Sequence, residues 1–262
     1  MIISNLETNF LLELLLEVLP ISSSGHIELI SYFFSSIKPL SALDEHLSHV
    51  LIFLIQIIYI FPFLKILVYR KKWILILYIV INFISITALT TIGYLVKHLI
   101  LMKMFPTLSM PLPLGFLITT IFLLSIYFIN KSKSRTYYTL SFKESIFLGL
   151  WQCIALLPGV SRLATMILGA QVCGFTRKNS LFIAIASNAA ISGCSLLYLI
   201  YYNYNIENII FSFSTLAILK LISTLFISAL FFFLFIYFFN KNNIFILIIY
   251  EFLILLISYY IY

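Results

Sequence analysis

Long apolar runs, separated by short polar segments, make up most of the 262-residue chain. Six of these runs reach the roughly 20 apolar residues that a helix needs to cross a hydrocarbon core. They cover about residues 47–69, 73–95, 112–130, 181–202, 214–239 and 243–262. None has the period-two alternation of a barrel strand, so the spanning elements should be helices. The pattern predicts an all-α integral membrane protein with six transmembrane helices.

Two further apolar stretches are too short to cross a bilayer. The first covers about residues 10–19 and stops at Pro20, and the second covers about residues 146–157 and stops at Pro158 and Gly159. At 1.5 Å per residue, each helical piece reaches only about 15 to 18 Å, around half of the hydrocarbon core. Each breaks into a polar turn, PISSSGH or PGVSR, and then resumes as a second apolar piece. This pattern is typical of a re-entrant helix hairpin, whose irregular backbone is tolerated at membrane depth only where it lines a cavity.

The composition supports a membrane protein, because 63% of the residues are hydrophobic and only 10% are charged. A net charge of +7 would suggest a nucleic-acid partner in a soluble chain. Here the basic residues form short clusters between apolar runs, where they set orientation, so we expect no nucleic-acid partner. The ten basic residues expected on the cytoplasmic side are Arg70, Lys71, Lys72, Lys131, Lys133, Arg135, Lys143, Arg177, Lys178 and Lys241. The three expected on the opposite side are Lys38, Lys97 and Lys103.

The order of the elements predicts an inverted repeat within a single membrane domain covering residues 1–262. Each half, about residues 1–135 and 136–262, holds one short hairpin and three spans. Because three is odd, the second half is upside down relative to the first, and the two hairpins enter from opposite sides. Inverted repeats of this kind place their binding site near the midplane, where the broken helices meet.

Glu13 and Glu17 stand four residues apart in the first short stretch, so both carboxylates lie on one face of a helix. A carboxylate in an apolar half-helix costs at least about 2 kcal/mol unless a cation or a water-filled cavity compensates it. Two such oxygen donors suit a hard divalent cation such as Mg²⁺ or Ca²⁺. The alternative is an interfacial helix whose acids lie among the lipid headgroups.

Three serines and a histidine follow the break at Pro20. Ser22, Ser23 and Ser24 offer hydroxyl nucleophiles, and His26 offers an imidazole that can accept or donate a proton near neutral pH. The alternative is structural, with Ser24 as the N-cap of the second half-helix.

Arg162, in the segment PGVSRLAT, cannot lose its charge by deprotonation and therefore requires an anionic partner in the membrane. Gly159 allows backbone N–H groups to approach a ligand closely, and Ser161 and Thr165 add hydroxyl donors. These residues predict a phosphate-binding site. The alternative is an ion pair between Arg162 and Glu13 or Glu17 across the two hairpins, and both interpretations can hold before a substrate arrives.

A further pair, Glu45 and His49, stands just before the first full span. Its position at the outer boundary favours a solvated pair, with an auxiliary metal or substrate contact as the alternative.

Two long motifs resemble the signatures of a known family, the bacitracin-resistance family of bacterial undecaprenyl-diphosphate phosphatases. The segment ELLLEVLPISSSGH, from Glu13 to His26, resembles the first signature, in which two glutamates four residues apart precede a turn of Pro, Ser and Gly-His. The segment QCIALLPGVSR, from Gln152 to Arg162, resembles the second signature, which ends in Pro-Gly-x-Ser-Arg. The resemblance covers nearly the whole chain, and it implies six spans with two opposed re-entrant hairpins.

The resemblance also implies roles for individual residues. Glu13 and Glu17 would bind the divalent metal or handle protons, and Ser23 would be the nucleophile with His26 beside it. Arg162 with Ser161 would hold the diphosphate. Beside this resemblance, we expect Ser22, Gly159 and Thr165 to contribute to the same phosphate site. The chain departs from the family after the arginine, where Leu163, Ala164, Thr165 and Met166 replace the usual Ser-Gly-Ala-Thr. The family threonine then falls on Met166 without a gap, with Thr165 as its neighbour. The acid of the next family segment matches Glu45.

The implied function is hydrolysis of undecaprenyl diphosphate to its monophosphate and inorganic phosphate, which recycles the lipid carrier for cell-wall synthesis and confers bacitracin tolerance. The chain would lie in the bacterial inner membrane with its site open to the outer, periplasmic side. A polyprenyl-phosphate transporter using the same anion site is the alternative. An intramembrane serine protease fits less well, because it has no use for a buried arginine and two carboxylates. Whether the chain acts as a homodimer stays open.

Overall fold

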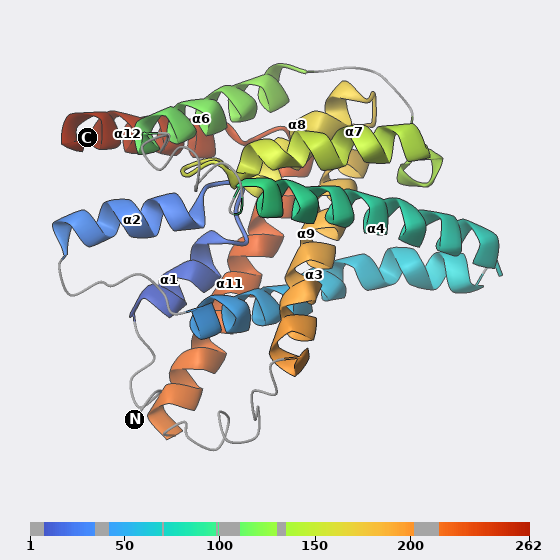
Figure 1. The fold of residues 1–262 in the computed structure, drawn as a ribbon, viewed down its shortest axis with the longest axis horizontal. Coiled ribbons are helices and arrows are strands. Elements are labelled where there is room, and N and C mark those ends of the chain that lie inside the picture. Colours follow the sequence, from blue (N-terminus) through green and yellow to red (C-terminus); the bar gives the residue numbers. More distant parts are fainter. Residues whose placement is uncertain are drawn as a thin grey trace.

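A computed structural model describes residues 8–34, 42–69, 71–97, 99, 111–129, 135–201 and 215–262. Every regular element in these ranges is a helix, as the apolar runs predict (Figure 1). The elements are α1 (Thr8–Leu16), α2 (Ser23–Phe33), α3 (Ala42–Tyr69), α4 (Trp73–Val96), α6 (Leu112–Phe128), η2 (Tyr137–Thr139), α7 (Phe142–Gln152), η3 (Cys153–Leu156), α8 (Arg162–Val172), α9 (Arg177–Tyr201), α11 (Thr215–Asn240) and α12 (Phe245–Ile261).

The six apolar runs predicted as spans correspond to six of these helices, with ends that differ by a few residues. Within the part of the chain that the structure describes, four helical segments are long and apolar enough to cross a membrane: Glu45–Tyr69, Trp73–Val96, Arg177–Tyr201 and Ile218–Asn240. α6 and α12 are equally apolar but contain 17 residues each. The chain is therefore a multi-pass membrane protein.

The distribution of side chains supports this conclusion. Large apolar side chains face outward along the long helices, including Ile74, Phe226 and Tyr260. Polar side chains such as Asn82 and Gln152 are buried between the helices. An apolar exterior around a partly polar interior is the arrangement that suits a lipid surrounding, because lipid cannot satisfy exposed polar groups.

Both short apolar stretches form pairs of short helices, and the predicted breaks are confirmed. α1 ends at Leu16, and α2 begins at Ser23 after the turn that contains Pro20. In the second pair, α7 passes through the 3₁₀ turn η3, and α8 begins only at Arg162. Proline lacks the N–H that would continue a helical ladder, which explains both interruptions.

The second short pair is tied together at its base by Arg135. α7 begins with a capping box formed by Ser141 and Glu144. The guanidinium of Arg135 donates to Glu144 Oε1 at 2.5 Å and to Glu144 Oε2 at 3.0 Å. It also donates to the backbone oxygen of Cys173, which follows α8, at 2.9 Å. One side chain therefore joins the start of α7 to the end of α8.

The remaining helices enclose the two short pairs. α9 packs against both α3 and α8, while α6 packs against α12 and α8 (Figure 1). α1 contacts α3 and α11, and α7 packs along α4. The buried core runs through all of these interfaces, with Leu14, Ile52, Met166, Phe182 and Phe232 among its fully buried side chains.

The turns of the two short pairs meet at α6. Gly159 adopts φ +79°, a conformation that a side chain would strain. A Cβ on Gly25, in α2, would lie 3.0 Å from Gly159 Cα. A Cβ on Gly115, in α6, would lie 1.8 Å from Pro158 O. The two turns therefore touch through backbone atoms, which brings the polar residues beside each turn close to one another.

Candidate active site

The residues Glu13, Glu17 and Ser23 converge at the turn between α1 and α2. Ser23 Oγ lies 3.0 Å from Glu13 Oε1 and 2.6 Å from Glu17 Oε2. All three residues are buried, with 5% of Glu13 exposed. A hydroxyl carries one hydrogen and can donate only one bond at a time. Both contacts are therefore hydrogen bonds only when one carboxyl group carries a proton and donates it to Oγ. The cluster is built to hold a shared proton next to the serine.

Arg162, the first residue of α8, reaches across to this cluster. Its Nη2 pairs with Glu17 Oε1. The Arg162 side chain is 25% exposed, and the Glu17 side chain is 7% exposed. The ion pair across the two hairpins, one of the alternatives drawn from the sequence, is thus present. The Glu17 contact given for this guanidinium uses one of its nitrogens, Nη2.

The hydroxyls of Ser22 and Ser24 have different surroundings. Ser22 is the N-cap of α2 and accepts a hydrogen bond from Gly25 N at 3.3 Å. The structural alternative places the cap at Ser24, but α2 begins at Ser23 and Ser24 is exposed. Ser22 therefore uses its hydroxyl to start the helix that carries Ser23.

The turn before Arg162 is held by Thr119 of α6. Thr119 Oγ1 donates to Gly159 O at 2.9 Å and accepts from Ser161 N at 3.0 Å. Ser161 is the N-cap of α8 and accepts from Ala164 N at 3.2 Å. These contacts orient the first turn of α8, from which Arg162 extends. Gly159 and Ser161 thus lie beside the arginine, as the sequence suggested.

Thr165 and Met166, the two candidates for the family threonine, both face the interior. Thr165 is fully buried, and its Oγ1 donates to Ser161 O at 2.7 Å. Its own carbonyl accepts from Trp151 Nε1 at 2.9 Å. Met166 is part of the apolar core. The hydroxyl of Thr165 is therefore engaged with the backbone of its own helix in this structure.

His26 points toward α12. Its Nδ1 lies 2.5 Å from Ser22 O, and its ring stacks on Tyr250 at 5.6 Å between centroids. Its Nε2 lies 3.9 Å from Glu251 Oε2. Among the described residues, these contacts link His26 to the backbone beside Ser23, while the carboxylates of Glu13 and Glu17 are the groups that contact Ser23 Oγ.

His49 and Glu45, both in α3, differ in exposure. Glu45 is exposed, and its Oε1 lies 3.9 Å from His49 Nε2. His49 is buried, and its ring lies within electrostatic range of Arg162 and Glu17. The solvated position expected from the sequence holds for Glu45, while His49 forms part of the wall around the ion pair.

A divalent cation would find two protein carboxylates here. Within the described residues, no group of three or more His, Cys, Asp or Glu side chains is placed to hold a metal. Mg²⁺ commonly uses one or two carboxylates and completes its shell with water and substrate phosphates. Glu13 and Glu17 are two such carboxylates on one turn, although the oxygens that converge do so on the hydroxyl of Ser23.

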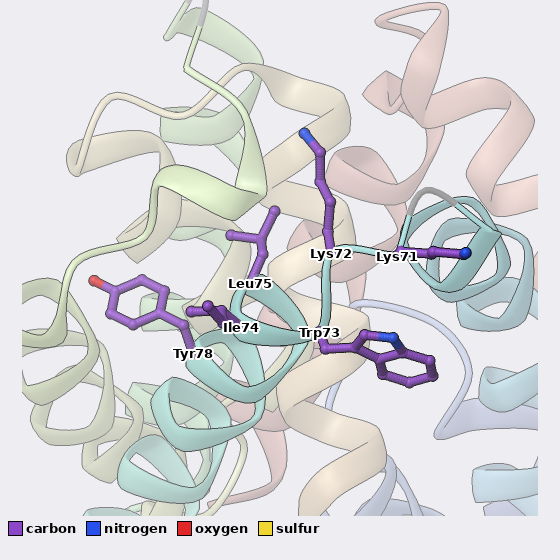
Figure 2. A pocket seen from close by; sticks show the side chains of 6 residues that line it. All are labelled: Lys71, Lys72, Trp73, Ile74, Leu75 and Tyr78. Carbon is purple, nitrogen blue, oxygen red and sulfur yellow. The ribbon is translucent and has the colours of Figure 1, made fainter.

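A surface cavity of about 650 Å³ lies elsewhere, at the junction of α3 and α4. It is lined by Lys71, Lys72, Trp73, Ile74, Leu75 and Tyr78 (Figure 2). Basic and aromatic side chains at a helix end are typical of a membrane–water boundary. Neither Glu13 nor Glu17 lines this cavity, so it is separate from the candidate active site.

Sequence reasoning missed three residues of this region. Gly115 and Thr119 lie inside an apolar run and have no local motif, so their roles depend on the packing of α6 against the second turn. Glu251 has a clear signal, because it is the one charged residue in the final apolar run. A carboxylate within a span is by itself an indication of a functional or paired residue.

Comparison with known proteins agrees with this geometry. The family model described as "Bacitracin resistance protein BacA" matches residues 11–257. The undecaprenyl-diphosphatase of Leptospira biflexa is 30% identical over 190 residues, which cover 65% of this chain and 66% of that protein. The undecaprenyl-diphosphatase of Pelagibacter ubique is 31% identical over 188 residues, which cover 70% of this chain and 69% of that protein.

A third relative, the undecaprenyl-diphosphatase of Clostridium tetani, is 37% identical over 82 residues, which cover 30% of each chain. The alignments thus span about two thirds of the Leptospira and Pelagibacter proteins and a smaller part of the Clostridium protein. The family model spans both short helix pairs and all six long apolar helices. The chain therefore belongs to the bacitracin resistance protein BacA family.

Proposed function

We propose that the chain hydrolyses undecaprenyl diphosphate to undecaprenyl phosphate and inorganic phosphate. The observation that carries this proposal is the convergence of Arg162, Glu13 and Glu17 around the hydroxyl of Ser23. An arginine suits a diphosphate, and a hydroxyl between two carboxylates suits nucleophilic attack on phosphorus. The match to the family model, residues 11–257, includes all four of these residues, and relatives named undecaprenyl-diphosphatase align with about two thirds of the chain. The reaction would recycle the lipid that carries cell-wall sugars, and the family's name indicates bacitracin tolerance as its consequence.

The proposed membrane topology has six spans and two re-entrant pairs, α1–α2 and α7–α8. α1 has nine residues and reaches only about 14 Å, which is half of a hydrocarbon core. The two pairs would enter from opposite sides, as in an inverted repeat of residues 1–135 and 136–262. The contact between the two turns supports this topology, because hairpins of half-membrane depth entering from opposite faces meet near the midplane.

The orientation follows from the basic residues. Ten lie in loops assigned to one side and three in loops assigned to the other, which favours the cytoplasm for the larger group. The α1–α2 pair then enters from the periplasmic side of the bacterial inner membrane. We propose that the site opens to that side, with the isoprenoid tail of the substrate remaining in the lipid.

Arg162 has two successive roles in the proposed reaction. Before the substrate binds, its guanidinium neutralises Glu17. A diphosphate carries more negative charge than one carboxylate and competes for the same guanidinium, which has five N–H donors. Binding would therefore draw Arg162 toward the phosphates and release Glu17 as a proton acceptor for Ser23, which lies 2.6 Å away.

The chemical steps follow from this placement. Ser23 Oγ forms a bond to the terminal phosphorus, the bridging P–O bond breaks, and the lipid monophosphate leaves with the electron pair. The Ser23 proton passes to Glu17. Water then attacks the phosphoserine, which releases inorganic phosphate and returns the proton to Ser23 Oγ. A water activated by Glu13 or Glu17 is the alternative nucleophile.

A bound Mg²⁺ or Ca²⁺ would supply charge neutralisation for the phosphate oxygens. Glu13 and Glu17 are the residues that would hold it. The protein's own contribution to the rate comes mainly from holding Ser23 next to the phosphate and from the fixed positive charge of Arg162.

A transporter of the same lipid is the second candidate function. It is favoured by one observation, the meeting of two broken helix pairs within the helical bundle, which is typical of secondary transporters. Transport and hydrolysis differ in their products, because transport leaves the diphosphate intact.

The deciding experiment measures phosphate release from undecaprenyl diphosphate by purified protein in detergent. We expect release by the wild type, loss in Arg162→Ala, and retention in the control Lys241→Ala, whose side chain is exposed at the turn after α11. A wild-type protein that binds the lipid but releases no phosphate contradicts the phosphatase and favours the transporter.

A further inference from the structure

Glu251 is a buried carboxyl group that the proposed reaction does not use. It lies in the middle of α12 and is 0% exposed. Neither of its carboxyl oxygens has a hydrogen-bond partner among the described residues. An acidic side chain inside an apolar helix is costly unless a nearby group complements it. Glu251 therefore needs a complementary group close to its carboxyl oxygens.

The imidazole of His26 is a polar group close to Glu251. His26 Nε2 lies 3.9 Å from Glu251 Oε2, and Nε2 has no other partner among the described residues. The ring is 2% exposed. Tyr250 stacks on it at 5.6 Å between centroids, and Phe116 meets it edge-on at 5.3 Å. Two aromatic rings thus fix the plane of the imidazole so that Nε2 is directed at α12.

The hydrogen bond made by His26 Nδ1 determines whether Nε2 donates or accepts a hydrogen bond. His26 Nδ1 lies 2.5 Å from Ser22 O, and a carbonyl oxygen only accepts. Nδ1 therefore carries a hydrogen, and Nε2 of the neutral ring is an acceptor. The carboxyl group of Glu251 is the group that can donate to it. The separation of 3.9 Å is longer than a hydrogen bond, and such contacts commonly tighten, or are bridged by water, when a substrate is bound.

The contact reaches Ser23 through the backbone. Ser22 O, the acceptor of the His26 hydrogen bond, belongs to the peptide bond that joins Ser22 to Ser23. Ser22 is also the N-cap that starts α2. Ser22 O also accepts the backbone N–H of His26 at 3.1 Å, so the imidazole adds a second hydrogen bond to the peptide that carries Ser23.

We propose that Glu251 is a positioning residue for the phosphatase site: by donating to Nε2 it holds His26 in the orientation that fixes the Ser22–Ser23 peptide. This inference rests on the proposed function, because it assigns a role within the same site. In this arrangement α12, at the far end of the sequence, contributes to the reaction without touching the substrate.

The first test compares Glu251→Leu, Glu251→Gln and the control Glu28→Gln, in which the altered side chain is exposed on α2. Leucine fills the space but cannot donate, so we expect kcat to fall about tenfold or more with KM unchanged. Glutamine can donate its amide hydrogen to Nε2, so Glu251→Gln and Glu28→Gln should keep most of the wild-type kcat. If Glu251 has no positioning role, Glu251→Leu should keep both its melting temperature and its kcat, because an apolar leucine suits a buried site.

A double-mutant cycle with His26→Ala tests the route through the imidazole. When His26 is absent, Glu251→Leu should cause no further loss of kcat. A full additional loss, or a Glu251→Gln variant as impaired as Glu251→Leu, overturns the proposal.

A second measurement does not depend on activity. In the ¹⁵N spectrum of histidine-labelled protein in detergent, assigned with His26→Ala, His26 should show a protonated Nδ1 and an Nε2 that accepts a hydrogen bond. Glu251→Leu should shift the Nε2 signal, and Glu28→Gln should not. An unshifted Nε2 signal overturns the contact. A wild type that releases no phosphate but shows the expected spectrum contradicts the proposed function alone, because the contact between Glu251 and His26 is then still observed.

Discussion

The guanidinium of Arg162, at the start of α8, pairs with the carboxylate of Glu17, which follows α1. The two residues are 145 positions apart in the sequence. Each belongs to a short helix pair whose turn touches the other through glycine backbone. The ion pair therefore joins the two halves of the chain at the place where Ser23 lies.

Removing one member of this pair should destabilise the protein. Glu17→Gln leaves the partly buried Arg162 without its anion, which should cost about 3 kcal/mol. It should also lower kcat by at least about a hundredfold, because the proposed proton acceptor is lost. Melting temperature in detergent and phosphate release measure the two effects.

The double variant Glu17→Gln with Arg162→Met separates the effect on stability from the effect on activity. Removing both charges should restore most of the melting temperature, because no unpaired charge remains, while phosphate release stays abolished. Recovery of activity in the double variant would contradict the proposed roles of both residues.

The serine cluster offers a matched pair of substitutions. Ser23→Ala removes the hydroxyl between Glu13 and Glu17 and should lower kcat by at least about a hundredfold. Ser24→Ala alters an exposed neighbour and should leave kcat unchanged. If Ser23→Ala keeps near-full turnover with metal present, water rather than Ser23 is the nucleophile.

Gly115 lies where α6 packs against the turn that contains Pro158 and Gly159, and this packing leaves no room for a side chain. A Cβ there would lie 1.8 Å from Pro158 O, so Gly115→Ala requires the backbone to move. We expect a loss of about 3 kcal/mol in stability and a fall in phosphate release, since Thr119 and the turn before Arg162 move together. Gly193→Ala is the control, because its nearest neighbour is a side-chain atom of Phe53 at 3.3 Å. Equal melting temperatures for the two variants would refute this prediction.

The stability that Arg135 and Glu144 contribute at the start of α7 should fall in acid. Burial acts to raise the pKa of Glu144, but hydrogen bonds from Arg135 and Ser141 outweigh it and hold the pKa below its ordinary value of 4.5. A lowered folded-state pKa stabilises the protein fully above pH 4.5, and this stabilisation is lost as the pH falls through the folded-state value. The wild type should therefore melt above Glu144→Gln at pH 6, and the difference should shrink below pH 4.5. A difference that stays constant down to pH 3 would exclude this contribution.

Removal of divalent cations tests the metal assignment. A chelator should abolish phosphate release, and added Mg²⁺ or Ca²⁺ should restore it, since two carboxylates and a diphosphate require a counter-charge. Glu13→Gln should raise the cation concentration needed for half-maximal activity. Full activity in the chelator would show that Arg162 alone neutralises the phosphates.

Much of the fold follows from patterns within single segments. Proline and glycine at 20, 158 and 159 interrupt two apolar stretches, and a polar turn follows each proline, so the chain breaks there. Pro62, which polar turn residues do not follow, lies inside α3. The pairing of Arg162 with a glutamate of the first hairpin was one of two alternatives, because a guanidinium in a membrane requires an anion. Local chemistry predicted the two breaks and named the candidate partners of Arg162.

Other features depend on tertiary packing and could not be predicted from local patterns. The direction of His26 toward α12 depends on its stacking on Tyr250 and on the edge-on contact with Phe116, and these two residues belong to distant helices. The hydroxyl of Thr165 is a plausible phosphate donor in sequence, yet the helix directs it to Ser161 O. The choice of Ser22 as the cap depends on where the backbone of α2 begins.

The glycine contact between the two turns also limits how this sequence can drift over evolution. An added Cβ at Gly115 or Gly159 would lie 1.8 or 2.8 Å from a backbone oxygen. A backbone oxygen cannot turn aside as the end of a flexible side chain can, so a substitution at either glycine has to move one turn relative to α6. These two positions therefore favour glycine, although neither residue carries a group that could react.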